Sequence, residues 1–179
     1  HWGLEYHDEP SREQKQIAKF LFRNGVTLIV GNHPHVVQSW EKFTIEEDLV
    51  LPSYNKSGIA NVPIKVKGPL KIRRNAFFMY SLGNFISGQR RNPNYQNPAH
   101  YREYTGDTVL MQLRIEKNEM MNAIRIKAQP ILLTVYNGVD GIVLRQFKPE
   151  WIASLPLAQQ NYYNTRLKLI QSVFYAEPK

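Results

Sequence analysis

The sequence predicts an α/β fold on three observations. An amphipathic segment with helix-capping residues lies near the amino terminus, and a β-branched run without polar alternation, residues 26–30, follows it directly. In the second half, residues 108–147, apolar and polar residues alternate as they do in hairpins. The 179 residues, 42% of them hydrophobic and 21% charged, are enough for a core. No repeat or linker divides them, so we expect one domain over residues 1–179.

The first helix has clear ends. We expect residues 1–9 to form the end of a strand and the loop that leaves it. Ser11 and Gln14 have the spacing of a capping box, and Gly25 suits the position just beyond a helix end. Four apolar residues share one face of this helix: Ile17, Ala18, Phe20 and Leu21. Strand, helix and strand in this order form a crossover unit, which predicts parallel neighbours in the sheet.

The middle of the chain is less regular. Residues 40–75 predict either short strands or an excursion, whereas Ala76–Tyr80 predicts a buried strand that ends in a turn at Gly83 and Asn84. Residues 88–107 hold two prolines, many polar residues and no periodicity. A structureless stretch of this length in a compact domain is usually functional or mobile.

The last part of the chain predicts two hairpins and a helix. Residues 108–131 alternate on both sides of a turn at Lys117 and Asn118, and residues 132–147 repeat the pattern around a glycine-rich turn. Residues 157–175 have the spacing of a helix. Its apolar face consists of Tyr163, Leu167, Ile170 and Phe174.

The composition narrows the function. Without cysteine the chain has no disulfide, thiolate metal site or cysteine nucleophile, so any metal must be bound by histidine, carboxylate or amide groups. A net charge of +8 and a pI near 9.7 indicate an anionic partner or serve solubility alone. The basic residues do not resemble a helical DNA-reading surface, so nucleic acid is not the expected partner. No apolar stretch reaches the roughly 18 to 20 residues that span a bilayer.

Histidines are concentrated near the amino terminus. His33 and His35 flank a proline directly after the run of aliphatic residues, and residues i and i+2 of an extended segment point to the same side. His1 lies at the end of the preceding expected strand, on the same edge of the sheet. Three imidazoles on one edge suit a Zn, Mn or Fe site. The alternative is that the pair is an accident of the surface.

Other polar residues have both structural and functional interpretations. Glu5 follows His1 at i+4 and could orient an imidazole or act as an acid or base, or it is a solvated loop carboxylate. His7 and Asp8 are interpreted as structural residues before the helix, and Ser81 and Asn84 either form a turn or line a site. His100 is interpreted as a loop residue. Its aromatic and cationic neighbours make substrate contact an alternative: Tyr95, Tyr101, Arg102 and Tyr104.

Three ordered blocks carry a resemblance to a known family. "HWGLEY", "GNHPHVVQ" and "FMYSLGNF" resemble the bacterial capsule synthesis family of poly-γ-glutamate biosynthesis, which is related to the calcineurin-like metallophosphoesterases. The resemblance covers His1 to Ile86, and the remainder resembles the family only in its strand-rich pattern. It implies that the chain is the carboxyl-terminal part of a metallophosphoesterase-like αββα sandwich. Because the sequence begins at His1 and not at methionine, we expect it to be a piece of a longer gene product.

The resemblance also implies a share of a two-metal site. His1, His33 and His35 would bind divalent Mn, Fe or Zn, and Glu5 and His35 would take part in catalysis. The family's earlier aspartate and Asn-His ligands are absent here, so this chain alone should bind metal weakly. The family often has a histidine where this chain has Asn32. The expected substrate-binding residues are Ser81, Asn84, Arg90, Arg91 and Arg102.

The function expected from this resemblance is a metal-dependent hydrolase of capsule biosynthesis. The substrate would be an acidic polymer such as poly-γ-glutamate, or a phosphorylated compound, held by basic residues from segments 65–74 and 90–102. Other membrane proteins of capsule synthesis would be partners. The location would be the extracytoplasmic cell envelope, with an anchor in a preceding segment. The alternatives are a non-catalytic polyanion-binding or export component, and a general metal-dependent phosphodiesterase.

Overall fold

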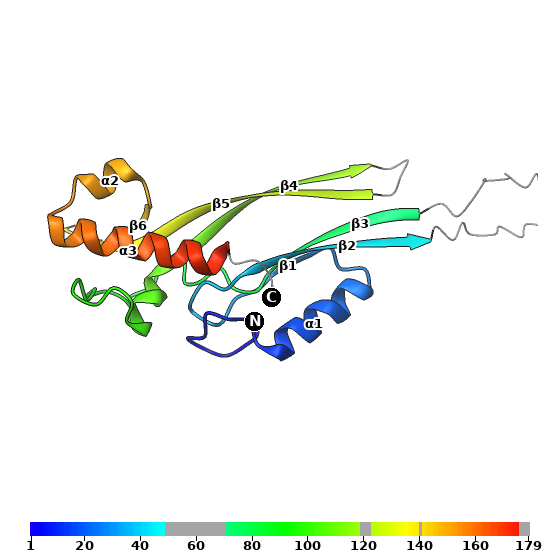
Figure 1. Ribbon diagram of the computed structural model, residues 1–179, viewed down its shortest axis with the longest axis horizontal. Helices are drawn as coiled ribbons and strands as arrows, with labels where there is room; N and C mark the ends of the chain where they lie inside the picture. The colour runs from blue at the N-terminus through cyan, green and yellow to red at the C-terminus, as the bar shows by residue number, and fades with distance from the viewer. Residues whose placement is uncertain (49–70, 119–122, 140, 176–179) are drawn as a thin grey trace, which may run out of the picture.

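The chain forms two small sheets and a few helices, a mixed α/β arrangement (Figure 1). The computed structural model describes residues 1–48, 71–118, 123–139 and 141–175. Its elements in chain order are α1 (Arg12–Arg23), β1 (Leu28–Val30), β2 (Trp40–Asp48), β3 (Lys71–Met79), the 3-10 helix η1 (Tyr101–Gly106), β4 (Asp107–Asn118), β5 (Ala123–Gly138), β6 (Gly141–Gln146), α2 (Pro149–Ala153) and α3 (Leu157–Phe174). Among the described helices, none is long and apolar enough to cross a membrane.

The first sheet has the strand order β1-β3-β2, with β1 parallel and β2 antiparallel to β3. The buried strand predicted at Ala76–Tyr80 is confirmed as the end of β3 and the residue after it. The strand expected within residues 1–9 is wrong, because Gly3 and Tyr6 have positive φ angles of 86° and 63°, outside the extended region. Two backbone hydrogen bonds instead attach this segment to the loop after β1: Trp2 N donates to the Asn32 carbonyl (3.1 Å), and Tyr6 N to the Pro34 carbonyl (2.8 Å).

Helix α1 begins at the predicted capping box but buries a different face from the one predicted. The Gln14 side chain accepts a hydrogen bond from Ser11 N at 2.9 Å, and its Nε2 donates to the buried Gln38 at 2.9 Å. This contact turns the Gln14, Ala18 and Phe22 face inward. The predicted apolar stripe therefore lies partly outside, with Ile17 39% and Phe20 64% exposed.

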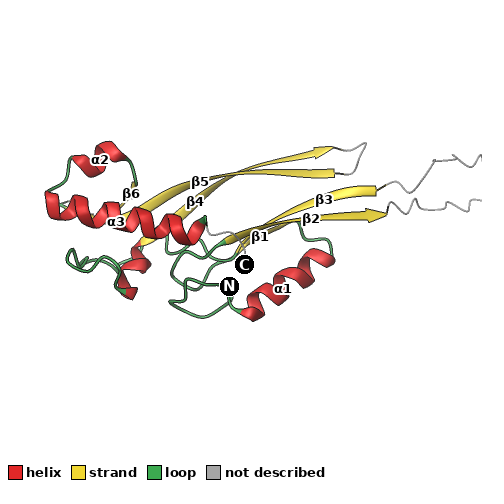
Figure 2. Cartoon of the chain, in the orientation of Figure 1, coloured by secondary structure: helices red, strands yellow, loops and turns green. Residues whose placement is uncertain are grey.

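The second sheet has the order β4-β5-β6, and both of its hairpins were predicted (Figure 2). The turn predicted at Lys117 and Asn118 is wrong, because these residues end β4 and pair with Ile124 and Ala123. β4 and β5 pair antiparallel from Asp107 opposite Thr134 to the far end, and β5 turns back into β6 between Gly138 and Gly141. An antiparallel bridge between Gly83 and Thr108 connects the segment after β3 to the start of β4. The end of the first sheet and the start of the second are thereby held together.

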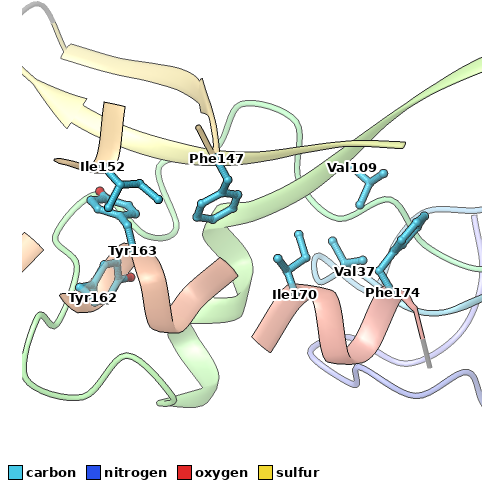
Figure 3. Packing of buried hydrophobic residues seen from close by; sticks show 8 residues of the cluster. All are labelled: Val37, Val109, Phe147, Ile152, Tyr162, Tyr163, Ile170 and Phe174. Carbon is cyan, nitrogen blue, oxygen red and sulfur yellow. The ribbon is translucent and has the colours of Figure 1, made fainter. Parts of the chain in front are cut away.

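The larger hydrophobic core lies between α3 and the second sheet (Figure 3). The predicted face of α3 is confirmed, since Tyr163, Ile170 and Phe174 are buried and Leu167 packs against the same cluster. The buried members of this core are Val37, Val109, Phe147, Ile152, Tyr162, Tyr163, Ile170 and Phe174. A smaller cluster packs α1 onto the first sheet, with Phe22 against the rings of Phe43 and Phe78.

A buried ionic cluster connects α3, β4 and the loop of residues 88–106. The Asp107 carboxylate accepts hydrogen bonds from Arg90 Nη1 at 2.8 Å and from Arg166 Nε at 2.8 Å, and all three side chains are at most 2% exposed. Burial opposes the positive charge of Arg90, but the adjacent Asp107 carboxylate outweighs it and raises the pKa of Arg90 above its usual value. Nearby, the Tyr162 hydroxyl donates to the buried Glu103 carboxylate.

This cluster corrects one predicted site residue. Arg90 was expected to bind substrate, but its guanidinium is buried and donates to Asp107, to Thr134 and to three backbone carbonyls. A buried cation must be paired, and the Asp107 carboxylate pairs with this one inside the protein, while the Arg90 Nε atom is buried without a hydrogen-bond partner among the described residues. Arg90 therefore fastens the 88–106 loop to the second sheet.

Candidate metal centre

The loop after β1 has an unusual backbone at both of its histidines. His33 and His35 have positive φ angles of 113° and 63°, and the intervening Pro34 is buried. Such angles cost a non-glycine residue about 1 to 3 kcal/mol and are typical of functional sites. The prediction that the two rings meet because the segment is extended is therefore wrong. The turn itself brings them together, and His33 N donates within it to Asn32 Oδ1 at 3.0 Å.

Three potential ligand atoms converge at this turn. One ligand atom each from Glu5, His33 and His35 lie within 4.8 Å of one another. Within this group, His35 Nε2 and Glu5 Oε1 lie 3.5 Å apart. The ring of His1 packs against that of His33, with centroids 4.0 Å apart, but His1 is not a member of the close group. The structure thus places His1, His33 and His35 together as a chain of rings, while Glu5 supplies the third ligand atom.

The donor set of this group fits a divalent transition metal. Two imidazoles and one carboxylate suit Zn, Mn or Fe, and the charge of Glu5 offsets part of the charge of a cation. Ligand atoms on a tetrahedral zinc ion lie about 3.4 Å apart. The His35–Glu5 distance of 3.5 Å has this spacing, and the remaining ligand atoms lie within 4.8 Å of one another. The group is partly open to solvent, with the Glu5 side chain 49% and that of His35 31% exposed.

The His35 ring is held on two sides. Its Nδ1 lies 2.9 Å from Oδ1 of Asn84, in the loop after β3, and the ring of Tyr6 stacks on it with centroids 5.6 Å apart. Asn84 Nδ2 donates to Gln89 Oε1 at 2.6 Å and to the Thr105 carbonyl at 3.1 Å. Gln89 Nε2 in turn donates to the Tyr6 hydroxyl at 3.4 Å. Asn84, expected among the substrate-binding residues, thus contacts a candidate ligand.

The glycine before Asn84 is required by its surroundings. Gly83 has a φ of +77°, and a Cβ there would lie 2.5 Å from the carbonyl oxygen of Asp107. Only glycine permits this backbone conformation and this close approach between the two sheets. The "SLGNF" block is therefore fixed in place by the start of β4.

The other predicted site residues lie in different environments. Ser81 is buried and donates to the Val36 carbonyl at 2.7 Å, so it fastens the two loops together and does not face solvent as a substrate-binding residue would. Arg91 and Arg102 are exposed, and Arg102 Nε donates to the Gln89 carbonyl at 3.3 Å. Their role in substrate binding stays a prediction. The basic residues at 65–70 lie outside the described residues.

The remaining histidines have local partners. His7 Nδ1 lies 2.9 Å from the Glu5 carbonyl, and His100 accepts a hydrogen bond from Arg102 N at the start of η1. These contacts agree with the structural interpretation of both residues.

A hollow of about 170 Å³ adjoins the group of ligands. It shares Tyr6 with the surroundings of His35. Its lining residues are Tyr6, Asp8, Val36, Ala99, Tyr101 and Tyr104. The sequence pointed to Tyr101 and Tyr104 as aromatic neighbours of His100, but it gave no reason to select Tyr6, Gln89 or Thr105. Their contacts arise only when residues 1–9 and 84–105 are brought together.

The comparisons with known proteins concern mainly the first half of the chain. Residues 1–89 match the family model described as "Bacterial capsule synthesis protein PGA_cap". The chain is 34% identical over 89 residues to "Capsule biosynthesis protein CapA" of Bacillus anthracis, a match covering 50% of this chain and 14% of that protein. It is 26% identical over 118 residues to "PGA biosynthesis protein CapA" of Bacillus subtilis (strain 168), covering 66% of this chain and 20% of that one. The chain thus spans a fifth or less of these relatives. No solved structure matches it.

Proposed function

Because residues 1–89 belong to the bacterial capsule synthesis protein family, we propose that this chain carries part of a metal-dependent hydrolase site that acts in capsule biosynthesis. The observation that carries the proposal is the convergence of Glu5, His33 and His35 at a strained turn. The two sheets would be the carboxyl-terminal part of a metallophosphoesterase-like sandwich. The protein would act at the extracytoplasmic face of the cell envelope, anchored to the membrane through another segment.

The residues of the group have distinct roles in this proposal. His33 and His35 would bind a divalent cation, His1 would bind a second ion or support His33, and Glu5 would be a ligand or move a proton. When bound, the cation would polarise a phosphoryl or acyl oxygen of the substrate. Three neutral imidazoles and a single carboxylate neutralise little of the charge of two ions, so we expect this chain to bind one ion weakly.

The substrate would lie in the adjoining hollow. Tyrosine side chains there offer apolar faces and hydroxyl groups to a flexible chain, while the exposed Arg91 and Arg102 lie on the neighbouring loop and would attract its anionic groups. An acidic polymer such as poly-γ-glutamate has both an apolar stem and regular carboxylates. A phosphorylated compound would bind to the same two arginine side chains.

The experiment that tests the metal site is titration of the full chain with Mn²⁺ and with Zn²⁺ by calorimetry. We expect one weak site, and at least a tenfold loss of affinity in Glu5→Gln, His33→Ala and His35→Ala, because each removes one ligand of the group. His100→Ala is the matched control, since this histidine caps η1 and is not in the group. Equal binding by all four variants, or two tightly bound ions in the wild-type chain, would contradict the proposal.

A polyanion-binding component without catalysis is the second candidate, and the net charge of +8 favours it. The two candidate functions can be distinguished with a variant that keeps its basic side chains but loses a metal ligand. His35→Ala in the complete protein should abolish hydrolysis and reduce capsule output if the site is catalytic. Unchanged output from a folded His35→Ala protein, together with reduced output from Arg91→Gln plus Arg102→Gln, would favour the binding role.

A further inference from the structure

We propose that Asn84 is a positioning residue that fixes the tautomer of His35, with the proton on Nδ1 and the lone pair of Nε2 directed toward Glu5. The inference deepens the proposed function, on which it rests only for the statement that Nε2 is the metal-binding atom. The tautomer itself follows from hydrogen bonds between residues of the chain.

The first step is the orientation of the Asn84 amide. Its nitrogen and oxygen could in principle exchange places, but the Thr105 backbone carbonyl, which can only accept, lies 3.1 Å from Nδ2. The nitrogen must therefore face Thr105. Its second hydrogen is donated to Gln89 Oε1 at 2.6 Å, so both hydrogens of the amide are used. The group directed at His35 is the oxygen Oδ1.

The second step is the proton on His35. Asn84 Oδ1 lies 2.9 Å from His35 Nδ1, and this distance is favourable only if Nδ1 carries a hydrogen to donate. In the other neutral tautomer, the lone pairs of Nδ1 and Oδ1 would face each other across 2.9 Å. The competing acceptor, Glu5 Oε1, is farther away at 3.5 Å from Nε2 and belongs to an exposed side chain that can move. Asn84 therefore determines the tautomer of a neutral imidazole.

The third step is the rigidity of this arrangement. Thr105 lies in η1, between Glu103, which accepts from the Tyr162 hydroxyl, and Asp107, which pairs with two buried arginines. Its carbonyl is thus held by the buried ionic cluster and not by a mobile loop end. On the opposite side Gln89 connects Asn84 to Tyr6, whose ring lies against His35. His35 can neither turn over nor exchange its hydrogen-bond partner without breaking these contacts.

The consequence for the site is that the His35 ring is already oriented for metal binding before an ion is bound. Metal-binding histidines commonly donate their other ring nitrogen to an oxygen acceptor, which orients the ring, and loss of that acceptor typically weakens metal binding 10- to 100-fold. Here the acceptor is an amide supplied by the loop after β3. Asn84 need not touch substrate to matter for activity.

The test is a long-range ¹H–¹⁵N NMR spectrum of the full chain without metal, recorded where His35 is neutral. We expect the wild-type His35 ring to show a protonated Nδ1 and an unprotonated Nε2. In Asn84→Leu the proton should move toward Nε2, because Glu5 is then the remaining acceptor near the ring. A wild-type ring protonated on Nε2, or an unchanged tautomer in Asn84→Leu, would overturn the inference.

Metal titration gives the second measurement, with Asn24→Leu as the control because Asn24 lies exposed at the end of α1. We expect Asn84→Leu to bind Zn²⁺ 10- to 100-fold more weakly than wild type and Asn24→Leu to bind it equally well. Equal binding by Asn84→Leu would overturn the positioning role. If the wild-type chain binds no metal but shows the expected tautomer, the metal-site proposal fails while the role of Asn84 in fixing the ring stands. If Asn84→Leu does not fold, the wild-type spectrum alone decides.

Discussion

Replacement of Asp107 by asparagine should lower the stability of the chain far more than the small change in side-chain shape suggests. The carboxylate accepts hydrogen bonds from Arg90 and Thr134 on one oxygen and from Arg166 on the other, and the side chain is 2% exposed. In the variant an amide NH₂ would face one of the two guanidinium groups, and the cluster would keep an unpaired buried positive charge. Breaking a buried ion pair in this way costs about 3 to 5 kcal/mol, a large fraction of the roughly 5 to 15 kcal/mol by which domains are stable.

The assay for this prediction is urea unfolding followed by circular dichroism. With a slope of about 2 kcal/mol per M, a loss of about 4 kcal/mol lowers the midpoint by about 2 M. Glu116→Gln is the matched control, since Glu116 also lies between two cations, Arg114 at 3.0 Å and Lys127 at 4.0 Å, but on the surface. Exposed pairs contribute about 0 to 1 kcal/mol, so its midpoint should hardly move. Equal midpoints for the two variants would refute the argument that burial makes the Asp107 cluster important.

Three further predictions concern the backbone, the first helix and the effect of pH. Gly31→Ala should destabilise the chain by about 1 to 3 kcal/mol or more in urea unfolding, because its Cβ would lie 2.2 Å from the Tyr80 carbonyl oxygen; Gly88→Ala, whose Cβ would meet nothing closer than 3.9 Å, should be nearly neutral. Ser11→Ala removes the capping hydroxyl of α1 and should cost about 0.5 to 2 kcal/mol, and a thermal melt unchanged from wild type would contradict that role. Burial raises the pKa of Tyr163 above its usual range, so the unfolded chain loses this proton first and stability falls as pH rises above about 10. Tyr163→Phe should therefore reduce the slope of unfolding free energy against pH above that value by about 1.4 kcal/mol per unit, and an identical slope in the two proteins would count against it.

Local patterns in the sequence determined the elements that depend on neighbouring residues. The capping box at Ser11 and Gln14, the alternation through β4 and β5, and the apolar spacing of α3 are each read within a few residues, and the structure has all of them. Because such patterns are local, they also led to one wrong prediction, the buried face of α1. The apolar stripe of α1 does not decide which face is buried, because Gln14 makes a hydrogen bond to Gln38, 24 residues away.

The candidate site shows the same division. The candidate residues His33, His35 and Glu5 were selected from the sequence, the histidines from their chemistry and their position after a strand, and Glu5 from its spacing to His1 and the family resemblance. The backbone conformation that brings these side chains together was not predictable from the sequence. It depends on positive φ angles at both histidines and on backbone hydrogen bonds that dock residues 1–6 onto the turn, and neither has a periodic signature.

By itself, then, the sequence selected the candidate site residues and determined most of the segments that become helices and strands, because propensity and spacing act over short distances. Only the tertiary structure decided that Glu5 and not His1 completes the group, that Arg90 is buried beside Asp107, and that Asn84 faces His35. Each of these depends on pairing a polar group with a partner distant in sequence. Burial makes an unpaired group costly, and only the folded chain shows which partner is within reach.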